Sequence, residues 1–300
     1  MAHTHEHHGS SYRKAFAIGI GFNLAFVVVE AAFGVRAGSL ALIADAGHNL
    51  SDVAGLALAW GASVLSRRRP TRRRTYGLRR SSVLAALLNA VLLLIAIGAI
   101  AWEAVQRFAT PAPVSAGVVV WVAATGIAIN TATALLFARG SKGDLNIKGA
   151  FVHMAADAGV SAGVVVAGLV MSATGWSWVD PAISLLIVTV ILIGTWGLLR
   201  DSVNLALDAV PEGTDAEAVG TFLRALPGVT AVHDLHIWGM STTEVALTAH
   251  LVRPVVEDDG RFIARVCSEL HDRFGIEHTT LQIERAEDAA RCRLAPDHVV

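Results

Sequence analysis

Residues 45–52 read D-A-G-H-N-L-S-D, which places His48 and Asp52 four positions apart inside an apolar segment. The same spacing recurs in His153 and Asp157, inside a second apolar segment. Because residues at i and i+4 lie on one face of a helix, each pair offers an imidazole nitrogen and a carboxylate oxygen toward a common point. Two such helices side by side predict two nitrogen and two oxygen ligands, a set that suits tetrahedral zinc.

The composition indicates a membrane protein in a reducing compartment. Of the 300 residues, 54% are hydrophobic and 16% are charged, and the net charge is -1. Soluble domains carry about 25% charged residues, so this balance is that of a membrane protein. The two cysteines, Cys267 and Cys292, do not make a disulfide framework, which favours a reducing compartment.

The N-terminal residues 1–12 are polar and rich in histidine, so they do not form a cleavable signal peptide. The histidines are His3, His5, His7 and His8. Such a segment either holds a metal loosely or is an inert tail.

Six apolar segments, each close to the roughly 20 residues that cross the hydrocarbon layer, predict six transmembrane helices. The segments are 14–35, 40–65, 81–108, 114–138, 147–174 and 178–199. Glycine, proline and polar runs separate them, as loops require. Glu30 and Glu103 fall close to the ends of their segments, where a carboxylate is expected to reach the membrane interface.

Lysine and arginine are concentrated in alternate loops, which predicts the orientation of the bundle. Eight arginines lie between residues 67 and 80, and further basic residues lie near the N-terminus and around residue 142. The opposite side carries only Arg36 and Arg107. The N-terminus, the even-numbered loops and the C-terminal region are therefore predicted to be cytoplasmic. The arginine run is interpreted as a topology signal, with contact to anionic lipid or an electrostatic influence on the approach of cations as the alternatives.

The C-terminal third is more polar and predicts a separate domain. The spacing of its apolar residues predicts, in chain order, a helix, two strands, a helix and a strand over 214–226, 229–238, 244–252, 260–274 and 278–284. This αββαβ order predicts a small open α+β sheet with helices on one side. The predicted domains are a cytoplasmic tail (1–12), a six-helix transmembrane bundle (13–208), the α+β domain (209–286) and a flexible tail (287–300).

The four ionisable side chains need partners inside a membrane. Unpaired buried groups cost several kcal/mol, and within a bilayer they mark functional sites. A divalent cation removes that cost, and so do protons on the same groups. Because metal binding requires neutral histidine and ionised aspartate, binding releases protons. The site is therefore predicted to exchange a metal ion for protons, with a set of structural hydrogen bonds as the alternative.

Asp45 lies three residues before His48, on roughly the same face of the predicted helix. Its carboxylate could hydrogen-bond the ligands, relay protons or bind the arriving metal. The sequence leaves these roles open.

Five stretches resemble signatures of the cation diffusion facilitator family, in its bacterial zinc-exporter branch. They are residues 39–52, 75–80, 153–163, 180–184 and 232–238. The resemblance implies a six-helix membrane domain, a cytoplasmic ferredoxin-like domain through which two copies form a homodimer, and proton-coupled metal export between inward-open and outward-open states. It assigns the transport site to His48, Asp52, His153 and Asp157. A histidine in both pairs goes with zinc in this family, although affinity alone separates zinc poorly from cadmium and cobalt.

The same resemblance implies a second metal site between the cytoplasmic domains. The matching positions are His233, His250, Gln282 and Glu284. Glutamine is a poor zinc ligand, so other residues of the domain are candidates as well: His236, His271, His278, Cys267, Cys292 and His298. A further family site in the loop between the second and third helices is not expected, because residues 66–80 hold no histidine or aspartate.

The sequence thus predicts a proton-coupled antiporter that exports Zn²⁺, or also cadmium or cobalt, from the cytoplasm by alternating access. It is expected in the inner (cytoplasmic) membrane with both termini cytoplasmic, in contact with lipid and with no nucleic-acid partner. Zn²⁺ is expected as the transported substrate and as a regulatory ligand. Two alternatives are a membrane metal sensor without transport and an intramembrane metalloenzyme, although the His-x3-Asp pairs lack the glutamate base of a zinc-protease helix.

Overall fold

The computed structural model describes residues 9–66, 68–110, 112–138, 145–254, 258–289 and 291–294. The chain divides into two compact units, one drawn from Met1–Ala57 with Asn89–Trp196 and the other from Leu58–Leu88 with Gly197–Val300. The histidine-rich N-terminus (His3 to His8), the basic residues Arg139 and Lys142, and His298 lie outside the described residues, so the predictions that concern them stay predictions.

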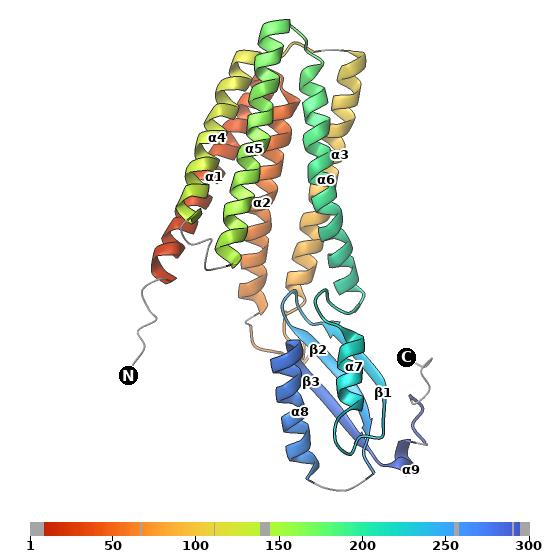
Figure 1. The fold of residues 1–300 in the computed structure, drawn as a ribbon. Helices are drawn as coiled ribbons and strands as arrows, with labels where there is room; N and C mark the ends of the chain where they lie inside the picture. Colours follow the sequence, from red (N-terminus) through yellow and green to blue (C-terminus); the bar gives the residue numbers. More distant parts are fainter. Residues whose placement is uncertain are drawn as a thin grey trace. The chain divides into compact units, whose positions relative to one another are not determined.

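Six long helices appear among the described residues, and each overlaps one predicted apolar segment (Figure 1). They are α1 (Gly9–Ala37), α2 (Leu40–Ser66), α3 (Ser81–Ala109), α4 (Ala116–Ala138), α5 (Leu145–Thr174) and α6 (Val179–Ala206). Among the described residues, four stretches have the length and composition to cross a membrane: Ser81–Ala109, Ala116–Leu135, Phe151–Thr174 and Val179–Ala206. The predicted spans over α1 and α2 are helical, but their crossing of the membrane stays a prediction.

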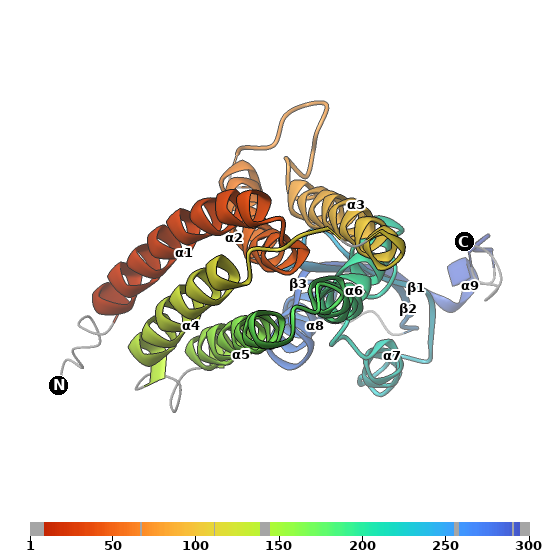
Figure 2. The same ribbon diagram turned by 90° about the horizontal axis from the view of Figure 1, so that it is seen from above.

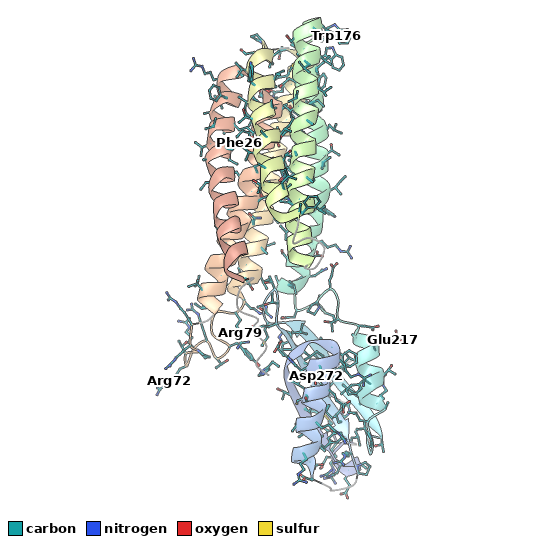
Figure 3. All side chains as sticks on the ribbon, turned by 60° about the vertical axis from the view of Figure 1, so that its left-hand side comes forward. Phe26, Arg72, Arg79, Trp176, Glu217 and Asp272 are labelled. Carbon is teal, nitrogen blue, oxygen red and sulfur yellow. The ribbon has the colours of Figure 1, made fainter. Side chains whose placement is uncertain are left out.

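In the first unit, α4 lies between α1 and α5, and the three helices run side by side (Figures 1 and 2). Glycines allow this close approach. A Cβ atom at Gly126 of α4 would come within 2.9 Å of the Phe26 ring of α1. A Cβ atom at Gly168 of α5 would come within 2.7 Å of the Val120 side chain of α4. Phe26, which Figure 3 labels, belongs to the buried apolar core of this unit.

The turn between α1 and α2 is fixed by one glycine and by a carboxylate from α6. Gly38 has φ of 67°, a left-handed value that ends α1, and the Ser39 amide donates to the Gly34 carbonyl at 2.9 Å. Asp180, in the first turn of α6, is fully buried. Its carboxylate accepts from the Leu40 amide at 2.8 Å and from the Ser39 hydroxyl. Asp180 thus caps the beginning of α2, whose amides would otherwise lack acceptors.

The second unit contains a three-stranded sheet with the strand order β1-β2-β3. Its elements are α7 (Ala216–Arg224), β1 (Ala231–Gly239), β2 (Val245–Val252), α8 (Asp259–Phe274), β3 (Ile276–Glu284) and α9 (Ala286–Ala289). β1 is antiparallel to β2, and β2 is parallel to β3, with α8 as the crossover that a parallel pair requires. The first five elements follow the predicted αββαβ order.

One face of the sheet carries the hydrophobic core. Leu247, Ala249 and Leu251 alternate along β2 and pack in one buried cluster with Leu223 of α7 and Leu270 of α8. Both helices therefore cover the same face, as predicted. The intervening residues of β2 point to the opposite face, because side chains alternate along a strand.

A β-bulge in β1 decides which face His233 occupies. His233 pairs with His250, whereas Ile237 pairs with Leu247, so β1 holds one more residue than β2 in this interval. Asp234 at the bulge has φ of 51°. In a regular strand, His233 and Ile237 would share the core face, since they are four residues apart. The extra residue instead turns His233 to the face of His250.

Two ion pairs connect the loop between α2 and α3 to other parts of the second unit. Arg79 pairs with Glu244 at 2.8 Å, and Arg80 pairs with Asp208. Arg72 is exposed; Figure 3 labels both Arg72 and Arg79 on this loop. Arg79 and Arg80 therefore form ion pairs with other residues of the protein, whereas Arg72 faces the solvent.

The segment after β3 turns back toward the sheet. It forms α9, and then the Arg291 amide donates to the Asp288 carbonyl at 2.9 Å and the Cys292 amide to the Ala289 carbonyl at 3.2 Å. These residues belong to the predicted tail 287–300, and its flexibility stays a prediction.

Candidate metal centres

The first candidate centre is formed by α2 and α5. His48 and Asp52 lie one turn apart on α2, and His153 and Asp157 lie one turn apart on α5. The Nε2 atom of His48 is 3.8 Å from Asp52 Oδ2 and 3.4 Å from Asp157 Oδ1. The Nε2 atom of His153 is 3.2 Å from Asp52 Oδ2 and 3.7 Å from Asp157 Oδ2. Each histidine therefore contacts both aspartates, whereas His153 does not belong to the group whose donors all lie within 4.8 Å of one another.

The burial of these four side chains is uneven. The Asp157 side chain is 2% exposed, whereas the His153 side chain is 43% exposed. Asp52 Oδ2 and Asp157 Oδ2 have no hydrogen-bond partner among the described residues. One donor from each of His48, Asp52 and Asp157 can be chosen so that all lie within 4.8 Å of one another. Two carboxylates with unpartnered oxygens beside two imidazoles can hold a divalent cation or protons.

Asp45 is fully buried and belongs to a polar chain behind this centre. It accepts a hydrogen bond from Ser161 of α5 at 3.0 Å, and the Glu30 carboxyl of α1 lies beside it. Glu30 in turn accepts from Asn49 of α2 at 3.4 Å. Glu30 Oε1 and Asp45 Oδ1 are buried without a hydrogen-bond partner among the described residues, a cost that a proton on either carboxyl group reduces.

The expectation that Glu30 reaches the membrane interface was wrong, because its side chain is fully buried. Its neighbours explain the difference: Asp45 and Asn49 of α2 supply polar partners that a position near a helix end does not reveal. The signal that could have indicated this role is a carboxylate within a segment of otherwise apolar residues.

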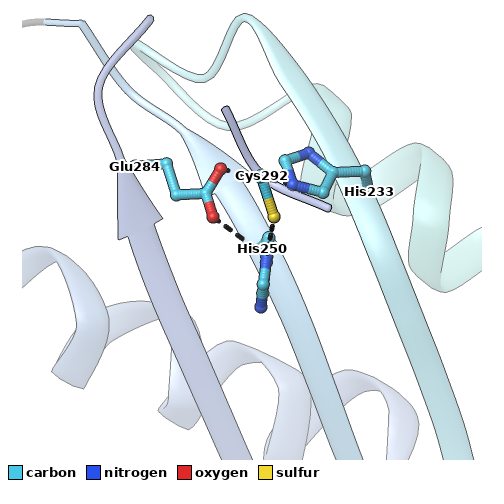
Figure 4. Close-up of side chains that lie close together, drawn as sticks. All are labelled: His233, His250, Glu284 and Cys292. Carbon is cyan, nitrogen blue, oxygen red and sulfur yellow. Dashed lines mark hydrogen bonds and ion pairs between the residues drawn. The ribbon is translucent and has the colours of Figure 1, made fainter. Parts of the chain in front are cut away.

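The second candidate centre lies on the face of the sheet opposite α7 and α8 (Figure 4). His233 of β1 places Nε2 3.2 Å from Glu284 Oε2, at the end of β3. His250 of β2 places Nδ1 3.0 Å from Glu284 Oε1 and 3.7 Å from the sulfur of Cys292. Donor atoms of these four residues all lie within 4.8 Å of one another.

Asp234 and Gln282 support this second group. Asp234 Oδ2 is 3.5 Å from His250 Nε2, the ring nitrogen that faces away from Glu284. A carboxylate on the far nitrogen of a histidine orients the ring and directs the other nitrogen toward a metal. Gln282 contacts the group through its amide nitrogen, which donates to Glu284 Oε1 at 2.8 Å. Of the four residues matched by resemblance, Gln282 thus acts here as a hydrogen-bond donor.

The remaining candidates have other partners. His236 is 2.8 Å from Asp234, His271 is 3.6 Å from Glu277, and the His278 ring packs edge-on against Tyr76. Burial raises the pKa of the Cys267 thiol. Cys292 is the one of these candidates, among the described residues, that joins the second centre. Nothing in its spacing indicated this, because the turn after α9 brings it there.

Comparisons with known proteins distinguish a membrane part of the chain from a C-terminal part. Residues 16–205 match the family model described as the cation efflux transmembrane domain, and residues 211–286 match the cation efflux protein cytoplasmic domain.

Curated relatives match over most of the chain, among them the three that follow. The zinc transporter ZitB of Shigella flexneri is 38% identical over 293 residues, which cover 95% of this chain and 93% of the relative. The metal cation efflux system protein CzcD of Cupriavidus metallidurans is 36% identical over 285 residues, covering 95% and 90%. A cadmium, cobalt and zinc/H(+)-K(+) antiporter of Bacillus velezensis is 32% identical over 291 residues, covering 95% and 93%.

Proposed function

The chain belongs to the cation efflux family, the cation diffusion facilitators that its motifs resemble, and on this premise we propose that it is a proton-coupled antiporter that exports zinc. It is a cation efflux transporter with a helical membrane domain, and its family is not an enzyme family. Zinc as the substrate rests on the two relatives named for zinc and on the donor set. Cadmium and cobalt are secondary substrates in this proposal.

The observation that carries the proposal is the meeting of His48, Asp52, His153 and Asp157. Two imidazole nitrogens and two carboxylate oxygens form the donor set that zinc accepts in tetrahedral sites. Zinc binds neutral imidazole and ionised carboxylate, so its arrival displaces protons from these groups. Protons that return from the opposite side displace the zinc. The same four residues thus exchange one kind of cation for the other.

Alternating access is supported by the fact that the metal-binding donors come from two different helices. Because α2 and α5 each supply one histidine and one aspartate, a relative movement of these two helices changes the site as a whole. A site opened toward one side binds zinc there, and the helix movement then presents it to the other side. Asp45 and Glu30, two buried carboxyl groups behind the site, are positioned to pass protons to or from it.

The proposal places the transporter in the inner membrane, with six spans and with both termini in the cytoplasm. The basic loops support this orientation. The C-terminal domain has the αββαβ order of a ferredoxin-like fold that lacks its first strand. We assign it as the cytoplasmic domain of a homodimer and assign a regulatory metal to His233, His250 and Glu284. The domain limits proposed are those predicted: 13–208, 209–286 and flanking tails.

Zinc flux into proteoliposomes tests the proposal. An acidic lumen should drive Zn²⁺ inward as protons leave, and dissipating the pH gradient should stop that flux. A potassium gradient forms a separate arm, because one relative is named for both protons and potassium. Zinc flux that does not change with either the pH gradient or the potassium gradient would refute antiport. Zinc flux driven only by the potassium gradient would refute proton coupling.

Carboxyl-to-amide variants test the site. Asp52→Asn and Asp157→Asn should each abolish zinc flux, whereas Asp272→Asn, an exposed carboxylate on α8, should leave it unchanged. Full flux in both site variants would remove the assignment. Metal binding by the unaltered protein without any flux would favour a sensor over a transporter.

A further inference from the structure

We propose that Cys292 is a thiolate ligand of the C-terminal metal centre and gives this centre a preference for soft divalent cations such as cadmium. The inference rests on the regulatory centre proposed above and adds a fourth donor from the segment after β3. The complete set is then one sulfur, two nitrogens and one oxygen. Soft thiolate donors select soft ions, whereas imidazole and carboxylate alone discriminate less.

The spacing of the donors fits one metal ion. Ligand atoms about 2.0–2.3 Å from a tetrahedral ion lie roughly 3.3–3.8 Å from each other. The His250–Cys292 and His233–Glu284 separations, 3.7 Å and 3.2 Å, are close to such tetrahedral edges. The longest separation in the group, within 4.8 Å, needs only small side-chain movements to contract around an ion.

Two polar atoms in this group face each other without a hydrogen bond. The His233 Nε2 and Glu284 Oε2 atoms are 3.2 Å apart, and neither has a hydrogen-bond partner among the described residues. His233 is 9% exposed and Glu284 is 4% exposed, so water compensates them poorly. In the tautomer of His233 that carries no proton on Nε2, two lone pairs are directed into one space, which is costly unless a cation lies between them. This pair is an observation independent of the cysteine and points to a ligand.

The strands fix the other donors before any metal arrives. His233 and His250 are direct neighbours across β1 and β2, and their rings meet edge-on with centroids 5.1 Å apart. Asp234 holds the far nitrogen of His250, so Nδ1 is left to face Glu284 and Cys292. Figure 4 shows the Cys292 sulfur directed into this group from outside the sheet.

The role of Gln282 separates this inference from the ligand set matched by resemblance. The Gln282 amide nitrogen donates a hydrogen bond to Glu284 at 2.8 Å, which orients the carboxylate, and a side-chain amide is not among the usual ligands of zinc. The fourth position is therefore open to Cys292. In consequence, metal binding would hold the segment after α9 against the sheet, since Cys292 is the donor that does not belong to a strand.

Cobalt binding to the full-length protein tests the inference. An Asp52→Asn/Asp157→Asn background removes two donors of the membrane centre, so added Co²⁺ reports on the C-terminal centre. Thiolate coordination gives a near-ultraviolet charge-transfer band that nitrogen and oxygen donors do not give. The band should appear in this background, disappear on adding Cys292→Ser, and persist on adding Cys267→Ser, the matched cysteine control.

Competition between Cd²⁺ and Zn²⁺ supplies a second measurement. Cys292→Ser should weaken Cd²⁺ binding on the order of 100-fold or more, since even residues that only support a ligand change affinity 10–100-fold. Zn²⁺ binding should weaken less. Equal losses for the two ions would overturn the soft-ion preference.

The outcomes separate this inference from the transport proposal. Cobalt bound without a charge-transfer band, or a band that survives Cys292→Ser, would overturn the thiolate ligand while zinc flux in the unaltered protein stays intact. No cobalt binding in the background variant would overturn the C-terminal centre as a whole. A normal band with no zinc flux in the unaltered protein would refute the transport proposal and leave Cys292 as a ligand.

Discussion

His48 Nε2 lies closer to Asp157 on α5, at 3.4 Å, than to Asp52 on its own helix, at 3.8 Å. His153 repeats the relationship, with 3.2 Å to Asp52 of α2 and 3.7 Å to Asp157 of its own helix. The shorter contacts therefore cross between the helices. A site built from such contacts depends on the separation of α2 and α5, which the spacing within either helix does not control.

Each aspartate of the membrane centre should be needed for tight zinc binding. Asp52→Asn and Asp157→Asn each remove a carboxylate that contacts both histidines, so the dissociation constant for Zn²⁺ should rise on the order of 100-fold. Competition with a chromophoric chelator in detergent measures it. Asp272→Asn should bind zinc as the parent does. Unchanged affinity in both site variants would show that zinc binds elsewhere.

The buried pair of Glu30 and Asp45 should tolerate an amide but not a truncation. Glu30→Gln keeps a donor for Asp45 and an acceptor for Asn49, so the melting temperature should change little. Glu30→Ala leaves Asn49 without this acceptor and leaves Asp45 with Ser161 but without Glu30 beside it, which should cost about 1–3 kcal/mol. Glu103→Ala is the control, because it removes a carboxylate that is 47% exposed while Arg107 keeps its contact with the Gly38 carbonyl, and ion pairs with an exposed partner are worth about 0–1 kcal/mol. Equal melting temperatures for the two alanine variants would contradict the pairing.

Asp180→Ala should destabilise the beginning of α2. The variant leaves the Leu40 amide and the Ser39 hydroxyl without their buried acceptor, at a cost of about 1–3 kcal/mol. Thr189→Ala, at an exposed position of the same helix, should have little effect. Hydrogen exchange of the amides of residues 40 and 41 measures the local loss, and unchanged protection there would show that Asp180 is not their cap.

Gly38→Ala should lower the stability of the protein for two reasons. Its φ of 67° is strained for alanine, and the added Cβ would lie 2.9 Å from the Pro113 carbonyl oxygen. Strain of this kind costs of order 1–3 kcal/mol. Gly98→Ala is the matched control, because a Cβ there meets nothing within 4 Å and Gly98 lies inside α3. Thermal unfolding should separate the two variants, and a stabilised Gly38→Ala variant would contradict the assigned turn.

Asp259 should contribute to the acid sensitivity of the C-terminal domain. Arg285, at 2.6 Å, and Arg253, at 2.7 Å, lower the pKa of its carboxyl. A carboxyl with a lowered pKa stabilises the fold above its unfolded-state pKa, and this contribution is lost as the pH falls through the folded-state value. Asp259→Asn should therefore show a smaller drop in melting temperature between neutral and acidic pH than the parent does. An identical drop would show that the ion pairs do not affect folding.

The sequence was sufficient to predict the structure wherever residues repeat with the period of a helix or a strand. The i, i+4 spacing of His48 with Asp52 and of His153 with Asp157 placed each pair on one helix face, and apolar alternation located β2 within one residue of its observed start. Regular alternation failed at His233, since it would place this histidine beside Ile237 on the core face. The bulge at Asp234 depends on pairing with β2, which no local pattern reveals.

Contacts between segments that are distant in the chain could not be predicted from the sequence either. The burial of Glu30 depends on its partners Asp45 and Asn49 on the next helix, and the position of Cys292 depends on a turn that follows α9. Each is set by packing between elements, whereas the sequence pattern reports the elements one at a time.

The bulge at Asp234 makes the C-terminal centre sensitive to chain length at one point. Deleting a single residue between His233 and His236 would restore regular pleating and turn the His233 imidazole from the metal-binding face into the apolar interior. A deletion of the same size in a surface loop has no such effect, since loops absorb changes in length. The number of residues in β1 is therefore as much a part of the metal centre as the identity of its ligands.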